Sequence, residues 1–435
     1  MTGDYLARCA EAWLERPAGA AATMGTVLLS LALLPPAIAE EHSSLAEFVR
    51  DAVAANGAVL AAEAALRGDT ERQVGAARSY DNPEVSVQTE EIGAFDGAGH
   101  DRERRVVIGV AKRLDLHGKR RARMTVAEAK RLVARAELDG VRTEVAAELL
   151  DALARWRTAS ARVGLLATHE RTMADFEALA ERRRDAGDIS RMEANLATLA
   201  LAETRMRLAA ANAEQSMAAE GVRNVTFAGD EQRWPTLDFD LPALGGVRLD
   251  SVSALPVVRA ALLKAQMVAA EVDVARRDRR PDPTVSLGVG REAGAGLAEI
   301  GVSVPIAVLD RGAHAVSAAT ADATAATRAG DDVARRARVR FEASAERYRI
   351  ARSAWEEWLR DGAGSLGERE SLARRSWEAG ELEPADYLVH LDAAMELRTY
   401  ALDLRLAAWN AWFEWLVASG GLDDWLAMHA DGGGM

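Results

Sequence analysis

The sequence predicts a mainly helical protein with a small β part, built from two copies of one unit. Three observations predict this fold class. Long stretches rich in alanine, glutamate and arginine contain few prolines, a composition that favours helices packed closely through small side chains. Two pairs of short segments alternate apolar and polar residues, which is the period of a strand. Three sequence blocks occur twice in the same order, which indicates an internal duplication.

Matching residues relate the duplicated blocks to one another. NPEVSVQTE at residue 82 recurs as DPTVSLGVG at residue 282, so that Pro83 matches Pro283. VIGVAKRLDLHGKRRAR at residue 107 matches EIGVSVPIAVLDRGAHA at residue 299. RRRDAGDIS at residue 182 matches SWEAGELEP at residue 376, which pairs Gly187 with Gly380. Because the spacing between the blocks changes, we expect the loops of the two units to differ in length.

The chain begins with a candidate secretory signal. Its apolar core, Val27 to Leu34, is too short to span a bilayer and is followed by the small-residue pattern Ala37-Ile38-Ala39. An uncleaved N-terminal anchor is the alternative. The predicted organisation is a signal peptide (1–39), a first repeat (40–229) with strands at about 83–92 and 104–114, a linker or equatorial segment (230–255), a second repeat (256–420) with strands at about 283–291 and 298–307, and a C-terminal tail (421–435).

Composition argues against several classes of protein. The formal charge of -13 disfavours a nucleic-acid partner, which would need clustered lysine and arginine. Cys9 is the single cysteine, so we expect neither a disulfide framework nor thiol chemistry. The seven histidines have no paired spacing typical of a metal site. No catalytic or cofactor-binding motif stands out, and we predict that the protein is not an enzyme and needs no cofactor.

The predicted strands are suited to a membrane. Each is about 9 to 11 residues long, the length at which a tilted strand crosses a bilayer. Four strands cannot close a barrel, and open edges in lipid would leave backbone groups unpaired, so other copies of the chain must complete the sheet. We expect Val85 and Val87 to face lipid. The residues expected to face water in the shared barrel are Glu84, Ser86, Gln88 and Glu90.

Very long helices follow each strand pair. From Lys119 to Arg184 only isolated glycines interrupt the helical pattern, and about 65 residues correspond to roughly 95 Å of helix. Apolar residues recur at steps of three and four along it, as in a coiled coil. In the second unit the segment DGAGSLGE (361–368) contains three glycines, which should loosen the helix locally.

These features together resemble the TolC-like outer membrane factor family. NPEVSVQTEEIG, LDLHGKRRAR and GVSVPIAVLDRG are similar to blocks of its CzcC-like, heavy-metal-efflux branch. The resemblance implies a homotrimer with one twelve-stranded transmembrane β-barrel, four strands from each chain, in the outer membrane lipid. It also implies a periplasmic α-barrel of long helices, a periplasmic adaptor (membrane fusion) protein and an inner-membrane RND pump as partners, and heavy-metal cations as cargo.

Other functions stay open on the sequence alone. The same channel could serve drug efflux or type I protein secretion, since only the resemblance favours metals. A protein of another class, a periplasmic coiled-coil adaptor or scaffold that never enters lipid, would have strands polar on both faces. The apolar Val85 and Val87 argue against that alternative.

The resemblance also implies a role for the two glycine breaks as the periplasmic tip, where the adaptor docks. The residues that match the tip pattern are Arg183, Ala186, Gly187, Ser190, Ala379, Gly380 and Leu388. In the second repeat, Ser376 occupies the position of the arginine. Acidic residues also gather at the breaks and could form an acidic pore entrance, as in cation-selective pores. They are Asp185, Asp188, Glu378, Glu381, Glu383 and Asp386. Alternatively, these acids only favour the start of the following helix.

Overall fold

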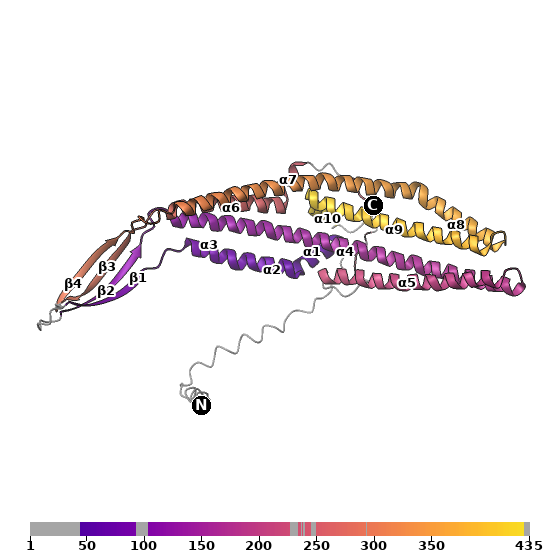
Figure 1. Ribbon diagram of the computed structural model, residues 1–435, viewed down its shortest axis with the longest axis horizontal. Coiled ribbons are helices and arrows are strands. Elements are labelled where there is room, and N and C mark those ends of the chain that lie inside the picture. The colour runs from indigo at the N-terminus through magenta and orange to yellow at the C-terminus, as the bar shows by residue number, and fades with distance from the viewer. Residues whose placement is uncertain are drawn as a thin grey trace, which may run out of the picture. The chain divides into compact units, whose positions relative to one another are not determined.

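The computed structural model describes residues 44–92, 103–226, 234–235, 237, 240–244, 249–292 and 294–429 (Figure 1). The predicted signal peptide and the tip of the first strand pair lie outside these residues, as do parts of the predicted linker. Of the two compact units in the chain, residues 43–435 form the second, which is the unit described below.

Helices make up most of this unit. The first eight α-helices in the described residues are α1 (Leu45–Ala55), α2 (Gly57–Ala65), α3 (Glu71–Arg78), α4 (Lys119–Ala186), α5 (Arg191–Thr226), α6 (Pro256–Asp278), α7 (Ala313–Glu357) and α8 (Ala363–Glu378). The last two are α9 (Pro384–Ser419) and α10 (Leu422–Met428). Shorter helical turns are η2 (Leu66–Thr70), η4 (Leu249–Ala254) and η5 (Trp358–Gly362). The strands are β1 (Glu84–Ile92), β2 (Glu103–Arg113), β3 (Thr284–Glu292) and β4 (Ala295–Ser303).

Helix α4 runs without a break for 68 residues, about 100 Å at 1.5 Å per residue. Its start is fixed by Asp115, whose carboxylate accepts hydrogen bonds from the Lys119 and Arg120 amides at 2.8 and 2.7 Å. Gly118 and Gly312 precede α4 and α7 in the left-handed conformation, at φ +68° and +64°. The two repeats therefore begin their long helices in the same way.

The four strands form one antiparallel sheet in the order β1-β2-β3-β4. Strands β1 and β3 each begin one residue after the aligned prolines, Pro83 and Pro283. The sheet therefore joins a strand pair from each repeat, with β2 and β3 at its centre. Within the chain β1 and β4 are its edges.

The prediction of a fourth strand at 298–307 is wrong at its C-terminal end. Strand β4 ends at Ser303, which pairs with Thr284, the first residue of β3. Pro305 has no N–H group for a ladder, so a strand cannot continue through it with full pairing. Residues 304–307 form a loop instead.

The same strand begins earlier than predicted. Glu292 pairs with Ala295, so the connection between β3 and β4 is a tight turn. Gly294 in that turn has φ +86°, a conformation that favours glycine. The residues between the two strands predicted at 283–291 and 298–307 therefore mostly belong to paired strand.

A large apolar core lies where α1, α4, α5, α7, α9 and α10 pack together. Trp156 packs edge-on against Trp234, with ring centroids 4.9 Å apart, and Tyr348 packs against Trp412 at 4.8 Å. Trp234 belongs to the predicted linker, which is thus anchored in the core where it is described. The Tyr348 hydroxyl donates to the Pro242 carbonyl, a second anchor of that segment.

The predicted C-terminal tail is partly a helix. Residues Leu422–Met428 form α10, and Trp425 is buried against Trp409 and Phe413 of α9. Gly420, at φ +74°, ends α9 and allows the chain to reverse. Burial of a large aromatic ring explains why these residues fold back on the core.

The glycine-rich segment 361–368 loosens the helix less than expected. A single π-helical turn, η5, separates α7 from α8, and the helical course continues through it. A Cβ on Gly362 would lie 2.3 Å from the Trp358 ring. This glycine therefore makes room for the tryptophan rather than breaking the helix.

Candidate functional site

The first candidate site is the turn between α4 and α5. Gly187 ends α4 at φ +84°, where the Asp188 amide donates to the Arg183 carbonyl at 2.8 Å and the Gly187 amide donates to the Arg184 carbonyl at 3.0 Å. These paired bonds define a Schellman motif, which satisfies the last carbonyls of a helix. The sequence therefore fixes where α4 stops.

A capping box starts the next helix. The Glu193 amide donates to the Ser190 hydroxyl at 3.2 Å, and the Ser190 amide donates to the Glu193 carboxylate at 2.6 Å. The hydrogen bonds from the Ser190 side chain and backbone lower the pKa of Glu193. Ser190, predicted as a tip residue, thus has a structural role in starting α5.

The turn between α8 and α9 repeats the same stop. The Glu381 amide donates to the Ser376 carbonyl at 2.9 Å, and the Gly380 amide donates to the Trp377 carbonyl at 3.1 Å. Gly380 has φ +75°, and Pro384 occupies the first turn of α9. Two equivalent helical hairpins therefore end in the same motif, as the repeated sequence block predicts.

Arg183 connects the two turns. Its Nη2 donates to the Trp377 carbonyl at 2.7 Å, and its guanidinium carbon lies 4.2 Å from the centroid of the Trp377 ring. Arg183 therefore supplies a positive charge at the C-terminal end of α8, which is favourable for the helix dipole. The equivalent residue of the second repeat is Ser376, which has no guanidinium group, so only the first repeat contributes this arginine contact.

An aromatic cluster that the sequence analysis missed lies behind these turns. The Trp377 and Tyr387 rings stack with centroids 5.5 Å apart, and Phe176 packs edge-on against Trp377 at 5.2 Å. Leu388, a predicted tip residue, is half-buried against this cluster. Trp377 lies inside the duplicated block at residue 376, and this position was the sequence signal that could have predicted the cluster.

The remaining predicted tip residues lie on the surface. Ala186 is the last residue of α4, Ala379 follows the end of α8, and both are exposed. They lie beside the glycines that reverse the chain. The structure therefore brings the two predicted sets of tip residues to neighbouring turns joined by Arg183.

All six predicted entrance acids are exposed at the two turns. Asp185 forms an ion pair with Arg184 at 2.8 Å, and this hydrogen-bonded pair raises the pKa of Arg184. Arg182 and Arg375, both exposed, also lie at the turns. The turns thus carry both signs of charge, which the prediction based on the acids alone did not include.

The predicted water-facing residues of β1 share one face of the sheet. The residues are Glu84, Ser86, Gln88 and Glu90, all exposed. Val85 and Val87 lie on the opposite face, and they pair with Val110 and Ile108 of β2. That second face is apolar across the sheet, because Val110 pairs with Leu287, which in turn pairs with Ile300.

The polar face is less polar at its centre than the sequence indicates. Val107 of β2 is buried there, and a Cβ on Gly288 would lie 2.9 Å from its side chain. Further along, Arg105 forms an ion pair with Glu299 of β4 across β3. Glycines in β3 therefore make room for larger side chains on β2.

In the described part of the chain, no group of three or more His, Cys, Asp or Glu side chains could hold a metal ion. None of the described helices is both long enough and apolar enough to cross a membrane.

The Outer membrane efflux protein family matches residues 49–226 of this chain. The chain is 30% identical over 261 residues to the cobalt-zinc-cadmium resistance protein CzcC of Cupriavidus metallidurans, a match that covers 58% of this chain and 60% of that protein. It is 28% identical over 290 residues to the nickel-cobalt-cadmium resistance protein NccC of Alcaligenes xylosoxydans xylosoxydans, covering 62% of this chain and 61% of that one. The chain thus matches about 60% of the length of these curated relatives.

The fold is similar to that of a solved channel. The structure of CusC superposes with a TM-score of 0.73 at 14% identity, covering 86% of this chain and 91% of that chain. The matched family and the solved structures are outer membrane proteins rather than enzymes, and the similarity of fold confirms the predicted fold class. Residues 49–226 therefore match the outer membrane efflux protein family, and the chain has the fold of a solved outer membrane channel.

Proposed function

We propose that this protein is the outer membrane channel of a tripartite, RND-type efflux system that exports heavy-metal cations from the periplasm. In this proposal three copies of the chain share one barrel, and the long helices extend into the periplasm. An adaptor protein and an inner-membrane pump complete the path. The energy comes from the pump, so the channel needs no catalytic site of its own.

The observation that carries the proposal is an incomplete sheet with one exposed apolar face. Strands β1 and β4 each have a neighbour on one side within the chain, so their outer backbone groups need partners from other copies. On the apolar face Val85 is 72% exposed and Ile300 is 82% exposed. Strands of 9 to 11 residues with such a face are suited to lipid.

The opposite face of the sheet would then meet water inside the shared barrel. The four polar residues of β1 that lie there are Glu84, Ser86, Gln88 and Glu90. Their exposure in the single chain is consistent with a position beside a water-filled lumen. A periplasmic scaffold has no physical use for the apolar face, which argues against that alternative.

We assign adaptor docking to the surface around the two helical turns. Ala186, Gly187 and Ser190 are exposed at the first turn, and Ala379 and Gly380 at the second. Arg183 and Leu388 hold the two hairpins together from behind. The six exposed acids would ring the periplasmic entrance in a threefold assembly and favour cations there.

Heavy metals are the cargo that the relatives favour. Two proteins similar in sequence have names that refer to cobalt, zinc, cadmium and nickel resistance. Transported ions pass through the lumen, so a permanent ligand cluster is not needed for this role. Drugs and secreted polypeptides are the competing cargoes.

Deletion of the gene, followed by growth on zinc, cobalt, cadmium, nickel, copper and silver salts beside common drugs, tests the cargo. We expect hypersensitivity to metals. Sensitivity to drugs alone would refute the metal assignment. Complementation with two adjacent variants tests the strand faces at the same time: Gln88→Glu should restore growth, whereas Val87→Glu should not, because it places a charge in lipid.

Crosslinking of the detergent-extracted protein tests the shared barrel. We expect trimers, because the sheet edges of one chain must pair with those of another. A protein that stays monomeric in detergent would contradict this part of the proposal.

A further inference from the structure

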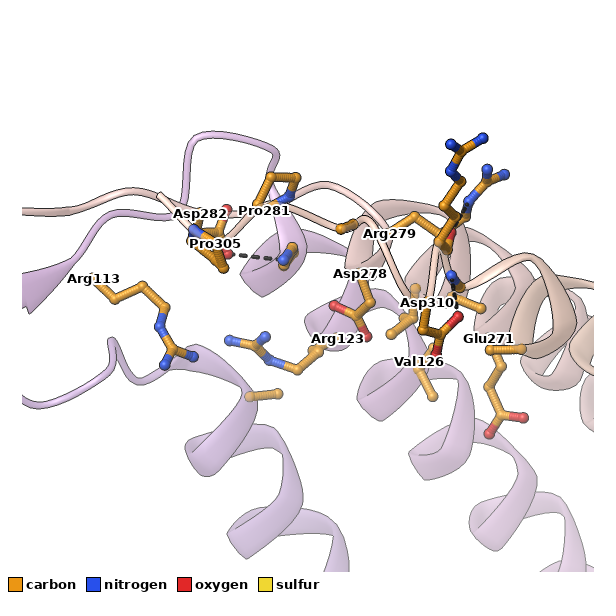
Figure 2. Close-up of a pocket in the computed structure, with 18 of the residues that line it drawn as sticks. Arg113, Arg123, Val126, Glu271, Asp278, Arg279, Pro281, Asp282, Pro305 and Asp310 are labelled. Carbon is orange, nitrogen blue, oxygen red and sulfur yellow. Dashed lines mark hydrogen bonds and ion pairs between the residues drawn. The ribbon is translucent and has the colours of Figure 1, made fainter. Parts of the chain in front are cut away.

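A large cavity lies where the strands meet the long helices (Figure 2). It has a volume of about 1250 Å³ and is lined by the ends of the strands and by residues of α3, α4, α6 and α7. Arg113 comes from the end of β2, Arg123 from α4 and Asp278 from α6. The cavity therefore brings together charged side chains from both repeats.

The strand register assigns the cavity to the polar face of the sheet. Its three strand residues are neighbours in register, because Arg113 pairs with Thr284 and Thr284 pairs with Ser303. Arg113 lies two residues beyond Ala111, the partner of Glu84, so both are on one face. The cavity is thus continuous with the face that meets water in the proposed channel.

Several charges around the cavity are already satisfied within the chain. Lys119 and Asp282 form an ion pair at 2.9 Å, with both side chains largely buried. Arg279 donates to the Arg311 carbonyl at 2.9 Å, and the Asp310 carboxylate accepts from the Gly312 amide at 2.7 Å. These contacts hold the loops at the rim of the cavity in place.

Arg113 and Arg123 are different. Among the residues that the structure describes, neither guanidinium has an ion pair or hydrogen bond, and Figure 2 shows the two groups pointing toward one another. Lys130 adds further positive charge to the lining. The carboxylates of Glu271 and Asp278 also line the cavity, but no described ion pair joins them to either arginine. Two like charges that converge without a counter-ion leave space for an anion between them.

We propose that Arg113 and Arg123 form a binding site for small oxyanions on the lumen surface at the junction of sheet and helices. Guanidinium groups suit such ligands because their fork of donors can bind two oxygens at once. The inference rests on the proposed channel, in which the site occurs three times around the lumen. It makes this level of the pore favour anions, opposite in sign to the acidic entrance at the turns.

The first test is titration calorimetry of the detergent-extracted full chain with inorganic pyrophosphate. We expect wild-type protein to bind it and R113Q/R123Q to bind about tenfold more weakly or not at all, because two charge-assisted contacts are lost. R113K/R123K keeps the charge and should retain part of the affinity. R121Q removes an exposed arginine of the same helix that does not line the cavity, and it should bind as wild type does.

The second test measures ion selectivity in planar bilayers under a potassium chloride gradient. R113Q/R123Q should shift the reversal potential toward that of potassium, and R121Q should leave it unchanged. Equal pyrophosphate binding and equal selectivity in wild type and R113Q/R123Q would overturn the inference. A wild-type protein that binds pyrophosphate but conducts no ions would instead refute the channel. If the double variant does not fold, R113Q and R123Q are each expected to lose part of the binding.

Discussion

Arg183 and Trp377 lie 194 residues apart in the chain and are joined by two contacts, a hydrogen bond of 2.7 Å from Nη2 to the carbonyl oxygen and a cation–π contact at 4.2 Å. Each contact ties the end of α4 to the end of α8. Because Trp377 is only 2% exposed, the arginine stacks on an aromatic cluster that the surrounding helices hold in place. The two turns therefore form one linked surface.

Loss of this link should loosen the two hairpins from one another. We expect Arg183→Ala to speed hydrogen exchange of the Gly380 and Glu381 amides and to cost about 1–3 kcal/mol locally, the size of a charged hydrogen bond with a cation–π contact. Hydrogen-exchange mass spectrometry measures the change. Arg182→Ala is the matched control, because Arg182 donates to the Ala178 carbonyl of its own helix. Equal hydrogen exchange in the two variants would show that the contact between Arg183 and Trp377 does not stabilise the turn between α8 and α9.

Gly187 is required for its backbone conformation rather than for space. A Cβ there would meet nothing within 4 Å, but φ is +84°. Gly187→Ala should therefore destabilise the turn by about 1–2 kcal/mol. Gly164→Ala, at an equally open helical position, should be neutral or stabilising by up to about 1 kcal/mol. Thermal unfolding followed by circular dichroism compares them, and a stabilised Gly187→Ala would contradict the argument.

His169 makes the helical region sensitive to acid. Its side chain is 8% exposed, and Nε2 is buried without a hydrogen-bond partner. Burial lowers the pKa of His169, and the charges of Arg207 and Arg398 lower it further against the opposing effect of Asp392. The unfolded chain therefore binds a proton that the folded chain excludes.

The sign of the pH dependence follows. Stability from the neutral imidazole is present above the unfolded pKa of about 6.5 and is lost as pH falls from there toward the lowered pKa of the folded state. We expect the Tm of wild type to drop between about pH 7.5 and about pH 5.5 by more than that of His169→Leu. His314→Leu, which removes an exposed histidine, should behave as wild type. An equal drop in all three proteins would exclude His169 as the cause.

The acids at the turns should affect ion selectivity unequally. Asp185→Asn with Asp188→Asn is predicted to lower cation selectivity in bilayer recordings, because both side chains are exposed at the proposed entrance. Asp188→Asn alone should give most of the change, since Asp185 is already paired with Arg184. Unchanged selectivity with a lower Tm would indicate that these residues only stabilise the start of α5.

Local patterns of the sequence were sufficient to predict most elements. Strand alternation located three of the four strands to within one residue at each end, since side-chain period depends on neighbours along the chain. The fourth was misplaced because alternation continues past Ser303 while the ladder does not. Whether a segment pairs depends on its partner strand, which the sequence pattern does not contain.

The sequence by itself determined the duplicated unit, the long helices, and the glycine stops at Gly187 and Gly380, because each rests on backbone preferences of a few adjacent residues. Only the tertiary structure decided what meets across long separations. It placed Arg183 on Trp377, a contact invisible in the sequence because its partners belong to different repeats. It also brought the side chains of Arg113 and Arg123 together in one cavity, because the strand register and the packing of four helices decide where these charges lie.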